Sequence, residues 1–449
     1  MQALEQLQRD VQEAELRLDP VRIGGVITEV GPSAFRVAGL SRYLKLGDVV
    51  SIAGVERASP GEVVKIDLTG VTVKSFDAKI EAGVGSPAFR ARPMLLNPHR
   101  SWKGRVLNAL GRPVDGLGPL LDGARSAPIE ADPPAAMRRD RVRRPMKSGI
   151  RVIDFFTPLC AGQRIGIFAG SGVGKSTLLA MLAGSSGFDS VVIALVGERG
   201  REVREFLDDA LGENRKLAIT VVSTADESAM MRRLAPKTAM AIAEYLRDQG
   251  ESVLLIVDSI TRFAHAARDV ALAAGEPAVA RGYAPSVFSE LPKLLERAGP
   301  GEVGGGSITG VFSVLVDGDD HNDPVADNIR GTLDGHIVLD RAIADQGRYP
   351  AVNVLSSVSR LAHHVWSKEQ RALVMKLRAM IARFESSRDL RLMGGYQAGS
   401  DPVMDQAVIF APKIYEAMNQ SQGDAPSLDA FRELANALQG DKAASSSEG

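Results

Sequence analysis

The sequence predicts an α/β protein in which a largely parallel sheet is covered by helices on both faces. The first observation behind this prediction is a set of near-continuous apolar runs alternating with longer helical patterns at 94–362: RIGIFA, SVVIALV, LAITVVS, SVLLIVD, SITGVFSVLV and HIVLD. Runs of this kind are typical of strands buried on both faces. The second observation is a stretch of shorter β-rich runs at 19–93, and the third is a helical, charged segment at 363–438. We therefore expect a central α/β domain flanked by two smaller units.

The first 18 residues predict a short amphipathic helix that stops before Asp19-Pro20. Apolar residues recur there at alternating three- and four-residue steps, which makes one narrow apolar stripe: Leu4, Leu7, Val11, Ala14 and Leu18. Such a stripe either packs on its own domain or docks on a partner. The residues alone leave both interpretations open.

Residues 19–93 predict a small β-barrel. Five short runs are separated by Gly, Pro, Asp and Ser turns: GGVITEV, AFRVAG, VVSIAG, EVVKIDL and GVTVKSF. Barrels that bind single-stranded RNA use aromatic stacking platforms on basic grooves. This segment has few aromatic residues (Phe35, Tyr43, Phe76 and Phe89). We therefore expect a structural or ring-building barrel.

Composition indicates a soluble globular protein. The chain has 449 residues, 45% apolar and 24% charged, with a net charge of −1. A near-neutral chain has no global field that attracts nucleic acid or acidic lipid, so we expect no nucleic-acid partner. The single cysteine, Cys160, fits a reducing compartment. No apolar stretch approaches the roughly 18 residues of a membrane span, and the first residues lack an apolar signal core. We expect a cytoplasmic protein with a disordered tail at 439–449.

The strongest signal for function is a glycine-rich run between the strand RIGIFA and the helix STLLAMLAG. Its residues are Ala169, Gly170, Ser171, Gly172, Val173, Gly174, Lys175, Ser176 and Thr177. Strand, glycine-rich loop and helix together predict a phosphate-binding P-loop. The glycines let backbone N–H groups approach phosphate oxygens, and the helix N-terminus adds partial positive charge. Lys175 would reach the β- and γ-phosphates, and the Ser176 hydroxyl would ligate Mg²⁺.

Two carboxylates follow apolar strands downstream of this loop. Asp258 closes the run Val253–Val257, at the strand end where α/β sheets bind ligands, and we expect it to hold Mg²⁺ through water. Glu198 ends SVVIALVGE, where a carboxylate can polarise the attacking water. A solvated charge at the start of a Glu/Arg-rich helix explains Glu198 equally well on composition alone.

Long segments of the sequence resemble the rotary ATP synthase catalytic-subunit superfamily. They include GRVLNALGRPVDG, KSGIRVIDFFTPLCAGQRIGIFAGSGVGKSTL, LVGERGREVREF and DGHIVLDRAIADQGRYPAVNVLSSVSR. GSGVGKST, GYAPSVFSELPKLLERAG and GGYQAGSDPVMDQAV are most similar to the export ATPases of type III secretion, the flagellar ones in particular. The resemblance covers about residues 20 to 435.

This resemblance implies a fold and a set of site residues. The fold is an N-terminal β-barrel, a RecA-like nucleotide domain and a C-terminal helical domain, assembled as a homohexamer. Glu198 becomes the catalytic carboxylate, and Arg199 belongs to the same site. Tyr349 stacks on adenine, because an aromatic face suits a nucleobase. Arg360 is the arginine finger offered to a neighbouring subunit, and Mg²⁺ accompanies ATP.

The resemblance also implies partners and a location. The first helix would bind a stator-like flagellar regulator, and the C-terminal domain would face the export gate, a stalk protein and chaperone–substrate complexes. The protein would be cytoplasmic and peripheral to the inner-membrane export apparatus, releasing chaperones and priming substrates. Four alternatives stay open: an injectisome ATPase, a proton-translocating ATP synthase subunit, an RNA translocase and a ring subunit that binds nucleotide without turnover. An ATP synthase is disfavoured by the absence of an acidic DELSEE-type loop.

Overall fold

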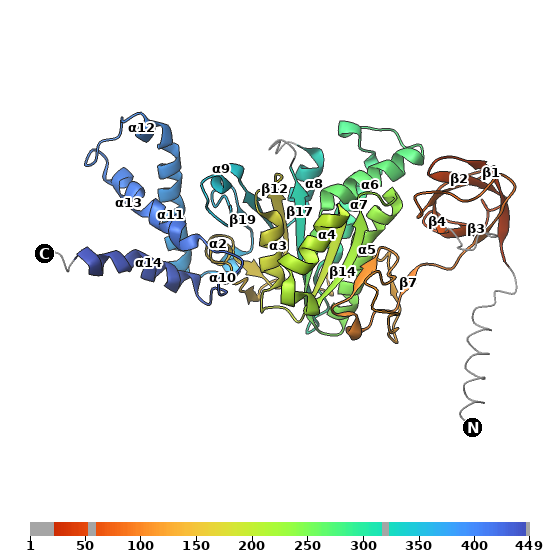
Figure 1. Cartoon of the computed structure of the whole chain (residues 1–449), viewed down its shortest axis with the longest axis horizontal. Coiled ribbons are helices and arrows are strands. Elements are labelled where there is room, and N and C mark those ends of the chain that lie inside the picture. The colour runs from red at the N-terminus through yellow and green to blue at the C-terminus, as the bar shows by residue number, and fades with distance from the viewer. Residues whose placement is uncertain (1–21, 53–59, 317–322, 446–449) are drawn as a thin grey trace, which may run out of the picture. The chain divides into compact units, whose positions relative to one another are not determined.

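A computed structural model describes residues 22–52, 60–316 and 323–445 of the chain (Figure 1). The described residues form two compact units. One contains the chain up to Met94 together with 228–230 and 269–276, and the other contains the remainder. The predicted helix at 1–18 lies outside the described residues.

The first unit contains a closed, six-stranded antiparallel barrel with strand order β1-β2-β5-β4-β3-β6. Its strands are β1 (Gly24–Val30), β2 (Ala34–Ala38), β3 (Val49–Ile52), β4 (Pro60–Asp67), β5 (Gly70–Ser75) and β6 (Pro87–Arg90). In β2 the apolar side chains of Phe35 and Val37 point into the core, and the residues that alternate with them are only partly buried. This alternation is what one buried face of a sheet requires. The barrel predicted from the sequence is confirmed.

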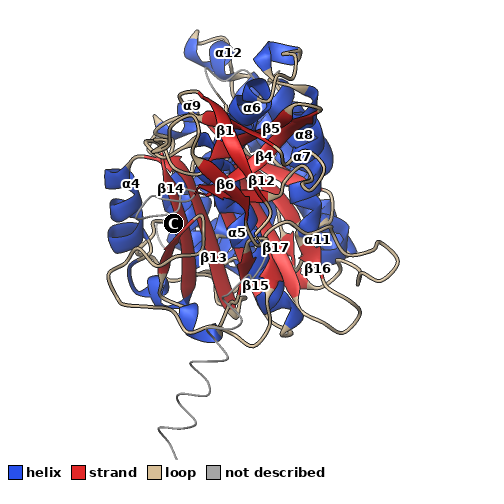
Figure 2. Cartoon of the chain, turned by 90° about the vertical axis from the view of Figure 1, so that its right-hand side faces the viewer, coloured by secondary structure: helices blue, strands red, loops and turns tan. Residues whose placement is uncertain are grey.

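The second unit is built on a sheet of nine strands (Figure 2). Seven are parallel, in the order β18-β12-β17-β15-β13-β14-β8. They are β8 (Val106–Asn108), β12 (Arg164–Ala169), β13 (Ser190–Glu198), β14 (Ala218–Thr224), β15 (Ser252–Asp258), β17 (Ser307–Leu315) and β18 (Gly335–Leu339). The short strands β16 (Gly299–Pro300) and β19 (Val358–Ser359) pair antiparallel at β17 and β18, so the sheet is mixed. Two-residue strands form separate pairs, β7 (Leu95–Leu96) with β9 (Ala127–Pro128) and β10 (Pro145–Met146) with β11 (Leu159–Cys160).

Helices cover this sheet and connect its parallel strands. They are α2 (Arg151–Phe156), α3 (Lys175–Ala183), α4 (Gly200–Glu205), α5 (Ala229–Asp248), α6 (Ile260–Ala273), α7 (Pro285–Arg297), α8 (Pro324–Thr332) and α9 (Arg341–Ala344). Every residue of β15 is buried, as expected for a central strand between two helical layers. Helix α4 continues into a π-helical turn, η2 (Phe206–Ala210), and then a 3₁₀ segment, η3 (Gly212–Leu217).

The described chain closes with five helices: α10 (Ala362–Val365), α11 (Lys368–Ser386), α12 (Arg388–Leu392), α13 (Pro402–Met418) and α14 (Ala430–Ser445). Helix α11 begins at a capping box, in which Ser367 and Gln370 bond each other's backbone N–H groups. Helix α13 packs against both α11 and α14. Helix α14 extends into the segment expected to be a disordered tail, and 446–449 lie outside the described residues. Within the described ranges, no helix has both the length and the apolar content that crossing a bilayer requires.

Candidate active site

The P-loop lies between β12 and α3, at the carboxyl edge of the parallel sheet. Ala169 ends β12 and is buried, and the loop turns through Gly172 (φ 76°) and Gly174 (φ 88°) into the first turn of α3. Both φ values lie in the left-handed region that only glycine adopts without cost. The loop borders a cavity of about 520 Å³. Its lining is Ala169, Gly170, Ser171, Gly172, Gly174, Lys175, Ser176, Thr177, Glu198, Arg199, Glu202, Arg262, Leu315 and Val316. Val173 is buried beneath the loop instead of lining the cavity.

Lys175 and Asp258 meet directly beside the P-loop. The Lys175 ammonium forms an ion pair with Asp258 Oδ1, and the Ser313 hydroxyl donates to the same oxygen at 2.5 Å. Asp258 is 3% exposed, at the end of β15, and Ser313 is buried on the neighbouring strand β17. A buried carboxylate of this kind needs both a counter-charge and hydrogen bonds. The structure therefore brings two of the predicted site residues into direct contact.

Glu198 ends β13 beside this pair. Its Oε1 lies 3.9 Å from Lys175 Nζ and 3.5 Å from Arg262 Nε. Burial raises the pKa of the Glu198 carboxyl above its ordinary value, Lys175 opposes that rise, and Asp258 adds to it. Arg262 also lowers the pKa, and a hydrogen bond with Glu202 raises it. A partly buried carboxylate with a raised pKa is a suitable proton acceptor near neutral pH.

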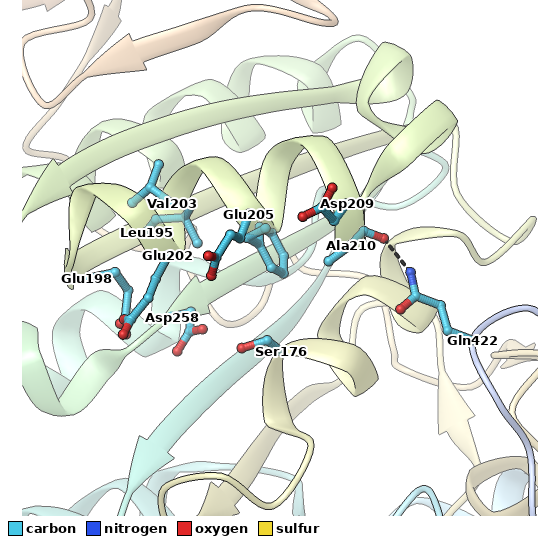
Figure 3. Close-up of a pocket in the computed structure, with 11 residues that line it drawn as sticks. Ser176, Leu195, Glu198, Glu202, Val203, Glu205, Asp209, Ala210, Asp258 and Gln422 are labelled. Atoms are coloured by element: carbon cyan, nitrogen blue, oxygen red, sulfur yellow. Dashed lines mark hydrogen bonds between the residues drawn. The ribbon is translucent and has the colours of Figure 1, made fainter.

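Sequence reasoning missed two members of this cluster, Arg262 and Glu202. Arg262 stands in the first turn of α6, four residues after Asp258, and Glu202 stands four residues after Glu198 in α4. Figure 3 shows Glu198, Glu202 and Asp258 gathered on one side of a pocket, with Ser176 opposite Asp258. Both residues stand in the first turn of a helix that directly follows a site strand, at the carboxyl edge of the sheet. That position is the signal that would have found them.

The ring of Tyr349 lies next to the P-loop at Gly174. A Cβ atom on Gly174 would come within 3.6 Å of the Tyr349 ring carbons Cδ1 and Cε1, and the residue is 45% exposed. The Tyr349 N–H donates to Asn419 Oδ1 at 3.1 Å, and its carbonyl accepts from the Gln420 N–H at 2.8 Å. These bonds hold the Tyr349 backbone beside the loop, and part of the residue's surface is open. An open aromatic face in this position can stack on a nucleobase.

The two remaining predicted residues are exposed. The Arg199 guanidinium lines the P-loop cavity and lies 3.8 Å from Glu202 Oε1, with its side chain 82% exposed. Arg360 follows β19 and donates to the Arg330 carbonyl at 3.4 Å. Arg360 does not line the P-loop cavity of its own chain.

The residues near the P-loop fit a magnesium ion bound together with a nucleotide. Mg²⁺ prefers oxygen ligands and is usually held by one or two protein groups plus water and phosphate. The Ser176 hydroxyl and the Asp258 carboxylate line the same pocket, and both supply oxygen. The two hydrogen-bonding contacts of Asp258 described above both use Oδ1.

The fold and this site define a class of protein. A glycine-rich loop between a strand and a helix, with a lysine and carboxylates from the ends of two further strands of a parallel sheet, is the arrangement of P-loop nucleoside triphosphatases. Comparison with family models agrees. Residues 149–359 match the ATP synthase alpha/beta family, nucleotide-binding domain, and residues 366–436 match the T3SS EscN ATPase C-terminal domain.

Individual relatives narrow the class further. The chain is 54% identical over 415 residues to the flagellum-specific ATP synthase of Rhizobium meliloti, covering 92% of this chain and 89% of the relative. It is 45% identical over 369 residues to the SPI-2 type 3 secretion system ATPase of Salmonella typhimurium, and the match covers 81% of this chain and 83% of that relative. The solved structure of the assembled ATPase EscN of enteropathogenic E. coli superposes on this chain with a TM-score of 0.85 at 37% identity. The superposition covers 92% of this chain and 99% of the EscN chain. The chain belongs to the flagellum-specific and type III secretion ATPases of the ATP synthase alpha/beta family, and it is an ATP hydrolase. This confirms the family and the fold class inferred from the sequence.

Proposed function

We propose that this chain hydrolyses Mg-ATP as a homohexameric ring and so energises flagellar type III protein export. The main support is that Lys175, Asp258 and Glu198 lie close together at one edge of the sheet. The chain is also similar to a flagellum-specific relative over nine-tenths of its length. In this proposal hydrolysis releases chaperones from export substrates and primes the substrates for the channel.

Each site residue has a role in the proposed reaction. Backbone N–H groups of Gly170–Gly174 and the start of α3 hold the phosphates, and Lys175 leaves Asp258 to grip the β- and γ-phosphate oxygens. Glu198 orients the attacking water and accepts its proton. Tyr349 stacks on adenine, and Arg199 contributes a positive charge at the cavity mouth.

Magnesium would be held by Ser176, with Asp258 acting through water. When bound with ATP, the ion neutralises charge on the phosphate oxygens. Release of Lys175 frees the buried Asp258 carboxylate for this role.

Arg360 acts on a neighbouring subunit in this proposal. Its guanidinium is exposed and does not line its own P-loop cavity, as a group that completes the site of another copy should be. The solved structure of EscN is described as assembled, and another contains EscN with its central stalk EscO. A ring with heterologous contacts supplies one finger to each P-loop.

The remaining surfaces would bind the export machinery. The helix predicted at 1–18 would dock on a stator-like regulator. The C-terminal helices would face the export gate, a stalk protein and chaperone–substrate complexes. The ATPase would then be a cytoplasmic protein peripheral to the inner-membrane export apparatus, with no nucleic-acid partner.

An affinity pull-down tests this assignment. Tagged Glu198→Gln protein is recovered from its native cells with ATP present, and the bound proteins are identified by mass spectrometry. The substitution should trap the ATP-bound ring with its partners, so flagellar export chaperones, a stator-like regulator and gate components are expected. Tagged Lys175→Ala protein, which should not retain ATP, is the matched control.

A virulence injectisome is the second candidate system. The match of 366–436 to the EscN C-terminal domain and the 45% identity to the SPI-2 ATPase favour it. Recovery of injectisome proteins in the same pull-down would replace the flagellar assignment and keep the ATPase chemistry. Recovery of ATP synthase subunits would overturn both export assignments.

A further inference from the structure

A short segment after α13 bonds to several parts of the nucleotide-binding site. Asn419 and Gln420 both hydrogen-bond the backbone of Tyr349. Gln420 is buried, and its side chain also accepts from the Arg151 N–H and donates to the Gly149 carbonyl, each at 2.9 Å. The Gln420 amide nitrogen also donates to the Ala425 carbonyl at 3.4 Å, so the side chain ties the segment after α13 both to itself and to the nucleotide domain. Asn419 and Gln420 form a fixed anchor next to the predicted adenine-stacking ring.

Gln422, two residues further on, reaches a different element. Its Nε2 donates to the Ala210 carbonyl at 2.6 Å, the contact drawn in Figure 3. Gln422 is exposed, and its backbone belongs to a turn in which the Ser421 N–H donates to Asp424 Oδ2 at 2.8 Å. The stretch 419–422 therefore bridges Tyr349 and Ala210 with only three peptide units, roughly 10 Å of extended chain.

Ala210 ends the helical segment that follows the catalytic strand. Strand β13 ends at Glu198, α4 begins two residues later and carries Glu202, and η2 continues the same helix to Ala210. Leu211 N–H bonds back to the Phe206 carbonyl, a five-residue step that makes this turn wide. Buried Phe206 and Leu207 hold η2 in the core beside α3. The end of this segment that points to the C-terminal helices is the end that Gln422 holds.

One cavity joins the two ends of the segment. Its volume is about 310 Å³, and it extends from Ser176, Glu198 and Asp258 along α4 and η2 to Ala210 and Gln422. Figure 3 shows Glu198, Glu202 and Asp258 at one end of this space and Gln422 at the other. Because the cavity leaves α4 and η2 unsupported on this side, contacts at the segment's ends limit its movement.

We propose that Gln422 is a positioning residue for ATP hydrolysis, which fixes the α4–η2 segment and couples the placement of Glu198 and Glu202 to the adenine-side anchor at Tyr349. The inference rests on the roles proposed above for Glu198 and Tyr349. Gln422 acts through the Ala210 carbonyl and not on the substrate. Losing its bond lets the segment move, which misplaces the water-orienting carboxylate and leaves phosphate binding intact.

Steady-state kinetics of the purified full chain test this proposal. Gln422→Met keeps the length of the side chain and removes the donor, so kcat should fall about 3- to 10-fold with KM for ATP changed less than about 2-fold. Gln422→Lys restores a donor and should recover most of kcat. Gln397→Met, an exposed glutamine in the α12–α13 connection, is the matched control and should behave as wild type. Gln422→Ala replaces the Met variant if that protein does not fold.

Hydrogen exchange supplies a second readout. ADP should slow exchange of backbone amides at 203–211 in the wild type, and Gln422→Met should remove most of that protection without loss of ADP binding. Unchanged kcat in Gln422→Met, a change confined to KM, or a Lys variant as impaired as Met would each overturn the proposal. A fully active Glu198→Gln enzyme would instead overturn the role of Glu198, which separates the two failures.

Discussion

Lys175 and Asp258 form an ion pair that joins the first turn of the P-loop helix to the end of the central strand β15. Their side chains are only 13% and 4% exposed. Each partner is also the group expected to bind a different part of Mg-ATP, the lysine the phosphates and the carboxylate the metal. The pair therefore joins both halves of the site, and we expect it to open when nucleotide binds.

Removing Lys175 should cost both activity and stability. Lys175→Met removes the charge that grips the β- and γ-phosphates, so hydrolysis should be lost. It also leaves Asp258 buried without a counter-charge, which should lower the free energy of unfolding by about 2–4 kcal/mol. The double variant Lys175→Met/Asp258→Asn removes both charges and keeps an oxygen that can accept from Ser313. It should regain most of the thermal stability and stay inactive. Normal hydrolysis in Lys175→Met would refute the P-loop assignment, as judged by ATPase rate and melting temperature together.

The environment of Glu198 predicts how the rate depends on pH. Glu198 must be ionised to accept a proton, and burial raises its pKa above the ordinary glutamate value. The rate should therefore fall as pH decreases through that raised pKa, earlier than an exposed glutamate would allow. Arg262 lowers this pKa, so Arg262→Gln should move the acid limb of kcat/KM to higher pH.

The control for this shift is Arg201→Gln. The Arg201 side chain lies on α4, is 85% exposed and pairs with Glu205, not with Glu198. Its acid limb should match that of the wild type. Glu198→Gln should lose about 10²- to 10⁴-fold in kcat while still binding ATP. If the acid limb of Arg262→Gln is unchanged or moves to lower pH, another group sets the pH dependence of kcat/KM.

Most of the fold could be predicted from the sequence because the parallel strands are buried on both faces. Continuous apolar runs such as SVLLIVD need no partner to be recognised, and β15 ends at Asp258 as expected. Strand β6 was missed, because PAFR is short and starts with a proline. Its strand conformation depends on pairing with β1 and β3, which local sequence does not encode.

The site divides in a similar way. Lys175, Ser176, Asp258 and Glu198 each follow a strand or open a helix, so topology alone places them at one edge. Gln422 comes from a segment whose position is set by tertiary packing, and none of the motifs quoted above contains it. Arg262 lies between these cases, since it stands in the first turn of the helix that follows the strand ending at Asp258.

The proposed role of Arg360 predicts that two inactive variants restore ATPase activity when their subunits are mixed. Arg360→Ala should lose about 10³- to 10⁵-fold in kcat if the guanidinium stabilises charge on the transferred phosphoryl group. Mixed with Lys175→Ala protein, it should regain part of its activity, because some interfaces then pair an intact P-loop with an intact finger. Random mixing at equal ratio makes about a quarter of interfaces competent in a closed ring.

The measurement is the ATPase rate over a series of mixing ratios, with each variant alone as the baseline. A maximum at intermediate ratio is the signature of a group that acts between subunits. A rate that never exceeds the sum of the two separate proteins would place Arg360 outside the neighbouring site.

Arg341 predicts a further contribution to phosphate binding. Its Nη2 donates to the Ser171 carbonyl at 2.9 Å, from the first residue of α9 to the middle of the P-loop. The peptide bond is planar and trans, so the Gly172 N–H points to the opposite side from the carbonyl that Arg341 holds. Fixing the carbonyl therefore fixes the direction of an N–H group in the phosphate cradle. Arg341→Met should raise KM for ATP and Kd for ADP about 5- to 10-fold, with kcat within about 2-fold of wild type.

Arg341→Lys keeps a donor but not the planar fork, and should lie between Met and wild type. Arg371→Met removes an exposed arginine from α11, away from the loop, and should leave KM unchanged. ADP affinity by fluorescence titration and steady-state kinetics together separate binding from chemistry. A loss confined to kcat would mean that Arg341 affects the reaction itself, and unchanged KM and Kd would mean that the Ser171 carbonyl needs no such support.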